Sequence, residues 1–162
     1  MTMTRCKWIL LAEDNANDAD LAMRALSSNH PPDLITWARD GLEALDCLYH
    51  RGELRPRCND PPTLVLLDLK MPRVDGMDVL QKIKSDQDLK GVPVVVFTSS
   101  SQEEDIARCY ELGANAYVVK PLDFQGLGSV LAKICDFWMH LNEPPNAALR
   151  SALNAAHVVL AA

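Results

Sequence analysis

Five short apolar segments, each followed by a segment with helical periodicity, constrain the fold of this chain more than any other feature. The apolar segments lie at 6–12, 34–38, 64–68, 94–98 and 115–119. Continuous apolar runs of this length are typical of strands covered on both faces. Parallel strands need crossover connections, which are usually helices. The sequence therefore predicts an α/β fold of five βα units, with helices on both faces of a parallel sheet.

The connecting segments carry apolar side chains at helical spacing. These stripes are Leu21, Ala22, Ala25 and Leu26; Leu42, Leu45, Leu48 and Tyr49; Met77, Leu80 and Ile83; Ile106, Cys109, Tyr110 and Gly113; and Phe124, Leu127, Leu131, Ile134 and Trp138. Asn15, Asn17 and Asp18 are candidate caps of the first helix. Residues 52–62 contain three prolines and are predicted as a long loop. Right-handed crossovers favour the flavodoxin-like strand order 2-1-3-4-5.

Composition excludes several classes of protein. A chain of 162 residues with 48% hydrophobic and 23% charged residues fits one ordered domain. No apolar run approaches the roughly 18 residues of a membrane span, and Met1–Arg5 does not begin a secretory signal. Because acidic residues outnumber basic ones by 22 to 16, nucleic acid is not an expected partner.

The cysteines give a further expectation about the compartment. Five are spread along the chain without a CxxC pair, namely Cys6, Cys47, Cys58, Cys109 and Cys135. An odd number without metal-ligand spacing argues against a zinc site or a disulfide framework. We therefore expect small buried side chains in a reducing cytoplasm.

Polar residues gather where the predicted strands end. Glu13 and Asp14 follow the first strand and Asp68 closes the third, which is its neighbour in the predicted order. Carboxylates this close repel one another. Mg²⁺, which prefers oxygen ligands, would relieve the repulsion. Thr98 and Lys120 end the fourth and fifth strands at the same edge of the sheet.

This set of residues suits phosphoryl transfer. Asp68 can act as a carboxylate nucleophile, while Mg²⁺ and the Lys120 ammonium neutralise charge on the phosphoryl oxygens. The Thr98 hydroxyl can donate a hydrogen bond to one of those oxygens. Taken singly, each residue has an ordinary explanation as a turn acid, helix cap, strand end or surface lysine. Their joint position at one sheet edge favours a site.

Four segments of the chain match a known family. They are Ile9–Asn15, Leu64–Pro72 with Asp75-Gly76, Val94–Ser99 and Gly113–Pro121. Their order and spacing resemble the receiver domain of two-component response regulators, which has a CheY-like fold. The resemblance implies a protein that is not a conventional enzyme, but that catalyses its own phosphorylation from a histidine kinase and its own dephosphorylation.

The resemblance also implies roles for individual residues. Asp68 becomes the phosphoacceptor, and Lys120 contacts the phosphoryl group. The metal ligands are Glu13, Asp14, Asp68 and the backbone carbonyl of Lys70. Thr98 and Tyr117 form the switch, in which Thr98 moves towards the phosphoryl group and Tyr117 occupies the space released. The family implies a cis Lys120-Pro121 bond.

A closer resemblance concerns the segments Asp40–Gly52 and Asp136–Met139, together with the proline-rich loop. They look like the small stand-alone regulators that partner phytochrome-type histidine kinases. Such regulators commonly form homodimers through the face that contains the fourth helix, fifth strand and fifth helix. Phe137 and Trp138 are either a core-plus-surface pair or partly covered by a partner.

Two positions depart from the common family pattern. Glu13 stands where the family often has Asp, which retains the charge with one more methylene group. Lys70 occupies a position that influences how fast the aspartyl phosphate hydrolyses, and a long cation there could shield the phosphate or crowd the attacking water. Replacing Lys70 by Ala is expected to change the half-life of the phosphorylated form.

The resemblance divides the chain into a flexible N-terminus at 1–5, a receiver domain at 6–142 and a C-terminal extension at 143–162. The extension is too short for an output domain, so a protein partner in the cytoplasm is the expected target, with no membrane association. Two alternatives are a haloacid-dehalogenase-type phosphatase, which the lysine at Lys70 disfavours, and a phosphorylation-independent interaction module. A nucleotide- or flavin-binding protein is a weaker option, because no Gly-rich loop follows the first strand.

Overall fold

The computed structural model describes residues 5–145, 152, 155–157 and 159–161. It confirms the predicted α/β fold, with a five-stranded sheet in the order β2-β1-β3-β4-β5. All neighbouring strands are parallel. The strands are β1 (Ile9–Ala12), β2 (Ile35–Ala38), β3 (Leu64–Leu67), β4 (Val94–Thr98) and β5 (Ala116–Val119).

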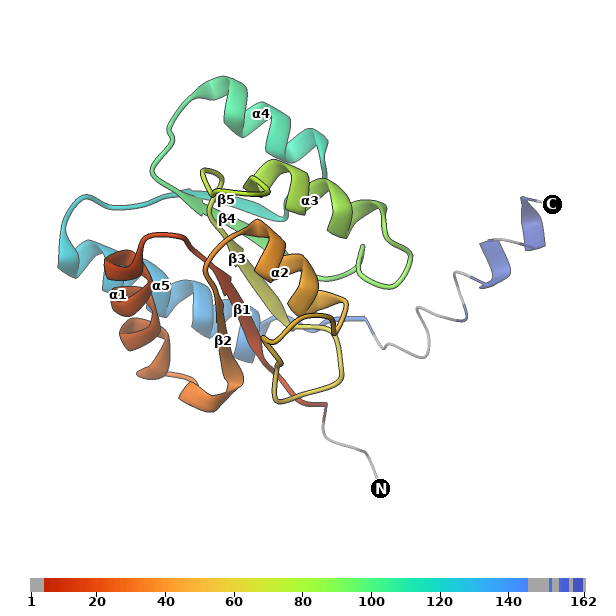
Figure 1. Ribbon diagram of the computed structural model, residues 1–162, viewed down its shortest axis with the longest axis horizontal. Helices are drawn as coiled ribbons and strands as arrows, with labels where there is room; N and C mark the ends of the chain where they lie inside the picture. The colour runs from red at the N-terminus through yellow and green to blue at the C-terminus, as the bar shows by residue number, and fades with distance from the viewer. Residues whose placement is uncertain (1–4, 146–151, 153–154, 158, 162) are drawn as a thin grey trace.

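Helices cover both faces of the sheet (Figure 1). They are α1 (Ala16–Ser27), α2 (Gly41–Leu48), α3 (Gly76–Ser85), α4 (Glu103–Glu111) and α5 (Phe124–Asp136), with a short 3₁₀-helix η1 (Pro32–Leu34) and a π-helical turn η2 (Phe137–Leu141). One apolar cluster joins the sheet to α2, α3 and α4, and a second joins it to α1 and α5. Because β1 and β3 contribute to both clusters, their side chains are buried on both faces.

Side-chain caps fix where four helices begin. Asn15, Asp40, Asp75 and Asp123 each accept a hydrogen bond from the backbone N–H three residues later. These bonds satisfy N–H groups that have no partner within the helix. Each cap lies shortly after a strand, so the caps also set where the chain leaves the carboxyl edge of the sheet.

Three large apolar residues of the predicted stripes are exposed. They are Leu42 on α2, Tyr110 on α4 and Phe124 at the start of α5, although Cys109 and Leu127 on the latter two helices are buried. Tyr110 follows the buried Cys109 directly, so its side chain points about 100° away around the helix. Phe124 is the first residue of α5, and the chain there lies at the rim of the sheet.

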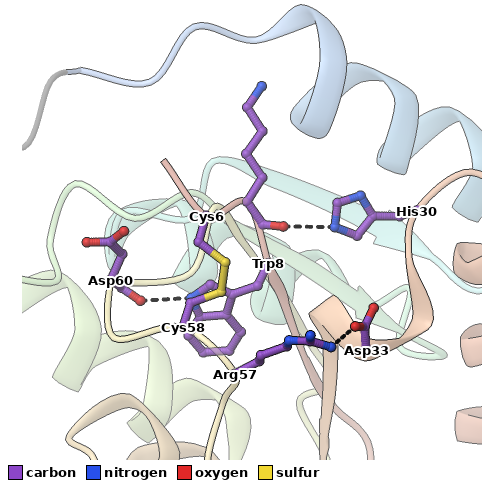
Figure 2. Close-up of a disulfide and its surroundings, with 8 residues drawn as sticks. Cys6, Trp8, His30, Asp33, Arg57, Cys58 and Asp60 are labelled. Carbon is purple, nitrogen blue, oxygen red and sulfur yellow. Dashed lines mark hydrogen bonds and ion pairs between the residues drawn. A yellow bond between two sulfur atoms is a disulfide. The ribbon is translucent and has the colours of Figure 1, made fainter. Parts of the chain in front are cut away.

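The predicted loop at 52–62 contains no helix or strand and belongs to a longer connection, the α2–β3 loop (residues 49–63). This loop corrects the expectation about cysteines, because Cys58 forms a disulfide with Cys6 (Figure 2). Their Cα atoms lie 6.1 Å apart although 52 residues separate them in sequence. The hydrogen bond from Thr63 N–H to the Trp8 carbonyl brings the loop beside the start of β1. Sequence spacing does not reveal such a contact.

Three further expectations concern the backbone and the chain ends. The described residues contain no cis peptide bond, so the Lys120-Pro121 bond is trans. The prediction of a cis bond at this position is wrong. The trans form is the more stable isomer of an X–Pro bond by about 0.5–1 kcal/mol. No helix among the described residues is long and apolar enough to cross a membrane. Residues 1–4 and much of the predicted extension at 143–162 lie outside the described residues.

Burial of His30 gives the fold a pH dependence. The ring Nε2 lies 2.9 Å from the Lys7 carbonyl oxygen, as Figure 2 shows. Burial lowers the pKa of His30 from 6.5 despite this hydrogen bond, and nearby Lys7 and His140 act in the same direction. The unfolded chain therefore binds a proton more readily than the folded one.

We expect wild type to lose stability relative to His30→Gln as pH falls through 6.5 and below, down to the lowered pKa of the folded state. Urea unfolding of both proteins between pH 5 and 8 measures the difference. A difference in unfolding free energy that stays constant across this range would contradict the prediction.

Candidate functional site

Three predicted acidic residues meet at the carboxyl edge of the sheet. Carboxylate oxygens of Glu13, Asp14 and Asp68 lie within 4.8 Å of one another. Glu13 and Asp68 are only 3% and 8% exposed, whereas Asp14 is open to solvent. The cluster therefore has a buried base and an accessible side.

Strand register brings these residues together. Ala12 of β1 pairs with Leu67 of β3, so the next residues, Glu13 and Asp68, leave the sheet side by side. The Asp68 N–H donates to the Ala12 carbonyl at 3.0 Å. Because both strands are buried on both faces, a slip in register would exchange the side chains of the two faces and disrupt the close packing of both apolar clusters. The hydrophobic core thus fixes the positions of the acids.

Lys120, the residue after β5, is the cation of the cluster. Its ammonium nitrogen lies 2.5 Å from Glu13 Oε2 and 3.2 Å from Asp68 Oδ2. The Lys120 side chain is 9% exposed. The backbone N–H of Lys120 donates to the Thr98 carbonyl at 2.7 Å. The ammonium therefore links β5 to β1 and β3 across the top of β4.

Asp18 is a further partner of Lys120, at 3.3 Å from its ammonium nitrogen. Asp18 was predicted only as a helix cap. It lies in the first turn of α1, and its contact with a residue 102 positions later leaves no local signal in the sequence.

Burial and charge oppose each other at Glu13. Desolvation raises the pKa of Glu13 to about 7 and outweighs the hydrogen bond and positive charge of Lys120. Burial also disfavours the charged ammonium of Lys120, but the hydrogen bond to Glu13 and the charges of Asp68 and Asp18 raise its pKa overall. Lys120 therefore remains protonated within the cluster.

Backbone donors orient the buried carboxylates. The Asn15 N–H donates to Glu13 Oε1 at 3.0 Å, and the Leu69 N–H donates to Asp68 Oδ1 at 2.8 Å. From β2, the indole N–H of Trp37 donates to the Glu13 carbonyl at 2.8 Å. Each buried acid thus has one oxygen held by the backbone and one facing Lys120.

The predicted switch residues are joined through a residue that the sequence analysis did not select. Thr98, at the end of β4, is fully buried, and the Ser100 N–H lies 3.5 Å from its hydroxyl oxygen. The Tyr117 hydroxyl donates to the Ser100 carbonyl at 2.9 Å. The Ser100 hydroxyl in turn donates to Asp105 on α4. The 98–101 segment therefore connects β4, β5 and α4.

The donor set fits a hard divalent cation. Every group in the acidic cluster offers oxygen, and neither histidine nor cysteine belongs to it. Oxygen ligands with an accessible side suit Mg²⁺ or Mn²⁺ rather than zinc. Lys70 is exposed in the turn after β3, and the role of its carbonyl as a ligand stays a prediction.

Comparison with known proteins decides the family. The model of the response regulator receiver domain matches residues 9–132, which include all five strands and the acidic cluster. The chain belongs to the response regulator receiver family. Membership confirms the resemblance found in the sequence and disfavours the phosphatase and the nucleotide- or flavin-binding alternatives.

Two curated relatives resemble this receiver over most of their length. A probable methanogenesis regulatory protein, FilR2 of Methanothrix harundinacea, is 42% identical over 86% of this chain and 88% of its own. Response regulator Rcp1 of Synechocystis is 40% identical over 82% of this chain and 89% of its own.

Solved structures point in the same direction. The phosphorylated cyanobacterial phytochrome response regulator RcpA is 38% identical, with a TM-score of 0.79, over 86% of this chain and 99% of its own. An Mn²⁺-bound form of Rcp1 has the same identity and coverage and a TM-score of 0.76. The bacteriophytochrome response regulator AtBRR is 44% identical, with a TM-score of 0.67, over 86% of this chain and 100% of its own. This receiver is therefore homologous to phytochrome response regulators.

Close packing of α3 against the site gives a mutational prediction. A Cβ atom on Gly76 would lie 2.1 Å from the Asp68 carbonyl oxygen and 2.6 Å from the Leu69 Cα. Backbone atoms cannot give way cheaply, so Gly76→Ala is expected to destabilise the receiver by about 1–3 kcal/mol. Chemical unfolding measures this cost.

Gly128→Ala in α5 is the matched control. Nothing lies within 4 Å of a Cβ atom at that position, so the helix should gain about 0.5–1 kcal/mol from the substitution. Equal effects of the two substitutions would show that contact with the Asp68 backbone is unimportant.

Proposed function

We propose that this receiver accepts a phosphoryl group on Asp68 from a phosphohistidine of a sensor histidine kinase. The observation that carries the proposal is the convergence of Glu13, Asp14 and Asp68 with the Lys120 ammonium at one sheet edge. Solvent reaches the cluster from the side of Asp14, which leaves a route for the donor. The phosphorylated state of RcpA supports the same chemistry in a relative.

Each residue has a task in the proposed transfer. The Asp68 Oδ2 oxygen attacks phosphorus, the bond between phosphorus and the histidine nitrogen breaks, and the imidazole leaves with the electron pair of that bond. Lys120 stabilises the negative charge on the phosphoryl oxygens. Glu13, Asp14, Asp68 and the Lys70 carbonyl would hold Mg²⁺, which supplies further positive charge when bound. The Mn²⁺-bound form of Rcp1 supports a divalent ion.

Thr98 and Tyr117 form the proposed switch. Phosphorylation adds strong acceptor oxygens near the end of β4, and the Thr98 hydroxyl turns towards them. Movement of the 98–101 segment changes the position of the Ser100 carbonyl, to which the Tyr117 hydroxyl donates. The signal then reaches α4, because Ser100 also contacts Asp105.

The surface beside Lys120 is the proposed docking site for the kinase. A depression at this position is lined by Leu21, Lys120, Leu122 and Phe124, among others. Leu122 is fully exposed, and Phe124 is 67% exposed. A donor histidine has to approach Asp68, so exposed apolar side chains next to Lys120 are well situated to contact the protein that carries it.

The remaining partner assignments follow from the relatives. The proposed kinase is a phytochrome-type photoreceptor, as the names of RcpA and AtBRR suggest for those proteins. The proposed homodimer uses the α4–β5–α5 face, where Tyr110, Val119 and Phe137 are exposed. The proposed location is the cytoplasm, where kinases obtain ATP.

Transfer of labelled phosphate from candidate histidine kinases tests the phosphoacceptor. Wild type is expected to acquire label when Mg²⁺ is present, whereas Asp68→Asn, which keeps the shape of the side chain, should acquire none. Folding of the variant is checked by its unfolding midpoint. Equal labelling of both proteins would overturn the proposed role of Asp68.

Metal binding is tested at the exposed ligand. We expect Asp14→Asn to weaken Mg²⁺ binding at least about 10-fold, because one of three carboxylates loses its charge. Trp37, which donates to the Glu13 carbonyl, offers a fluorescence readout. Asp20→Asn is the control, since Asp20 pairs with Arg24 on the exposed side of α1. Unchanged affinity in Asp14→Asn would argue against the ligand set.

The docking site is tested at Phe124. Phe124→Ala is expected to slow transfer from the kinase by about 10-fold or more, while phosphorylation by acetyl phosphate, which needs no docking, stays unchanged. Leu141→Ala is the control, because Leu141 is a similarly exposed apolar residue beyond the other end of α5. A loss of both reactions in Phe124→Ala would indicate damage to the site instead.

A further inference from the structure

The disulfide between Cys6 and Cys58 joins the segment before β1 to the α2–β3 loop. Cys6 precedes β1, and Cys58 lies in the α2–β3 loop. Figure 2 shows the bond beside the Trp8 ring. Cys58 is almost fully buried, whereas Cys6 is partly accessible. Cys6 is therefore the more exposed of the two bonded residues.

The other three cysteines are different. Cys47, Cys109 and Cys135 are buried and unpaired, and each belongs to a helix. Burial raises the pKa of the Cys47 and Cys109 thiols to about 11, which disfavours the reactive thiolate. Among the five cysteines, only Cys6 and Cys58 are paired, and only Cys6 is not buried.

Noncovalent contacts hold both ends of the α2–β3 loop. The Tyr49 hydroxyl donates to Asp86 at 3.0 Å, and the Thr63 N–H donates to the Trp8 carbonyl at 2.9 Å.

Around Cys58 the noncovalent contacts are weaker. The indole N–H of Trp8 donates to the Asp60 carbonyl at 2.8 Å, and Arg57 forms an ion pair with Asp33 whose side chains are more than half exposed. Exposed ion pairs contribute little to stability. The loop lacks helix and strand, and the disulfide is its covalent link to the start of β1.

We propose that Cys6 and Cys58 form a thiol–disulfide exchange site that controls whether the α2–β3 loop is anchored to the start of β1. In the oxidised form the loop covers Trp8 and packs Leu54 against the core. In the reduced form the segment between Tyr49 and Thr63 is released at its middle, and the side chains beneath it become accessible. Redox state is thereby a second input to the receiver.

The exchange partner is a low-molecular-weight thiol or a protein dithiol. In reduction, its thiolate attacks the sulfur of the more exposed Cys6, the bond to Cys58 breaks, and Cys58 leaves as a thiolate that takes up a proton. A second thiol then resolves the mixed disulfide at Cys6. Two electrons and two protons pass to the protein, and the partner is oxidised to its disulfide. Oxidation by the corresponding disulfide is the reverse.

The exchange site is spatially separate from the acidic cluster. Cys6 lies before β1, whereas Glu13 lies directly after it, and seven residues of extended chain span roughly 23 Å. The proposal therefore does not depend on the proposed phosphorylation. Redox state acts on the loop at the opposite end of the sheet.

Limited proteolysis across glutathione buffers tests the proposal. Trypsin can cleave after Arg51 and Arg57, both exposed in the α2–β3 loop. Cleavage of the purified protein is expected to be at least about 10-fold faster when reduced, since local opening governs cleavage. The thermal midpoint should fall by about 5–15 °C on reduction. Peptide mapping of the oxidised protein should yield a peptide pair linked through Cys6 and Cys58.

Two variants sharpen the result. Trypsin should cleave Cys58→Ala rapidly in all buffers. Cys135→Ala, which keeps Cys6 and Cys58, should be cleaved slowly when oxidised and rapidly when reduced, as the wild type is. The wild-type comparison stands even if a variant folds poorly. Absence of the linked peptide pair in every buffer, or equal cleavage of oxidised and reduced wild type, would overturn the proposal.

Discussion

Three carboxylates at one sheet edge need a positive charge close by, and much of this structure depends on how that charge is supplied. Two like charges about 5 Å apart repel by roughly 3 kcal/mol at an effective dielectric constant of about 20. Lys120 reaches Glu13, Asp18 and Asp68 from the end of β5. The edge strand is thereby tied to the centre of the sheet by charge as well as by its hydrogen bonds to β4.

The hydrophobic core determines where those charges lie. The side chains of β1 and β3 pack in two different apolar clusters, one on each face of the sheet, and this close packing fixes the strand register that places Glu13 beside Asp68. Gly76 allows α3 to begin against the backbone of Asp68. An Asp68 carboxylate held in this way is preorganised for the proposed phosphoryl transfer.

Much of this arrangement could be predicted from the sequence. The five apolar segments predicted the strands, their order and the sheet edge at which Glu13, Asp68 and Lys120 meet. Apolar periodicity is a local signal, and parallel topology converts it into proximity. The cap at Asn15 was predicted from an equally local signal.

The failures were contacts that depend on tertiary structure. The pairing of Cys6 with Cys58 depends on the path of a loop without periodic structure, and neighbouring residues carry no signal for it. Both Tyr110 and Phe124 fit a helical stripe, but Tyr110 points away from the buried side of α4 and Phe124 lies at the rim of the sheet. Ser100, which links Thr98 to Tyr117, has no motif of its own. Asp18 was predicted only as a cap, because its contact with Lys120 joins residues 102 positions apart in the sequence.

The central claim is that Lys120 and a divalent cation neutralise the same negative charge. Unfolding of wild type and Lys120→Gln at pH 8, with EDTA and with saturating Mg²⁺, tests it most directly, because Glu13 of the wild type, whose pKa of about 7 includes the lowering effect of Lys120, is then largely ionised. Without Mg²⁺ the substitution should cost about 3 kcal/mol, since buried carboxylates lose their counterion. With Mg²⁺ the cost should fall below about 1 kcal/mol, as the ion takes over that role. The same cost under both conditions would contradict the account.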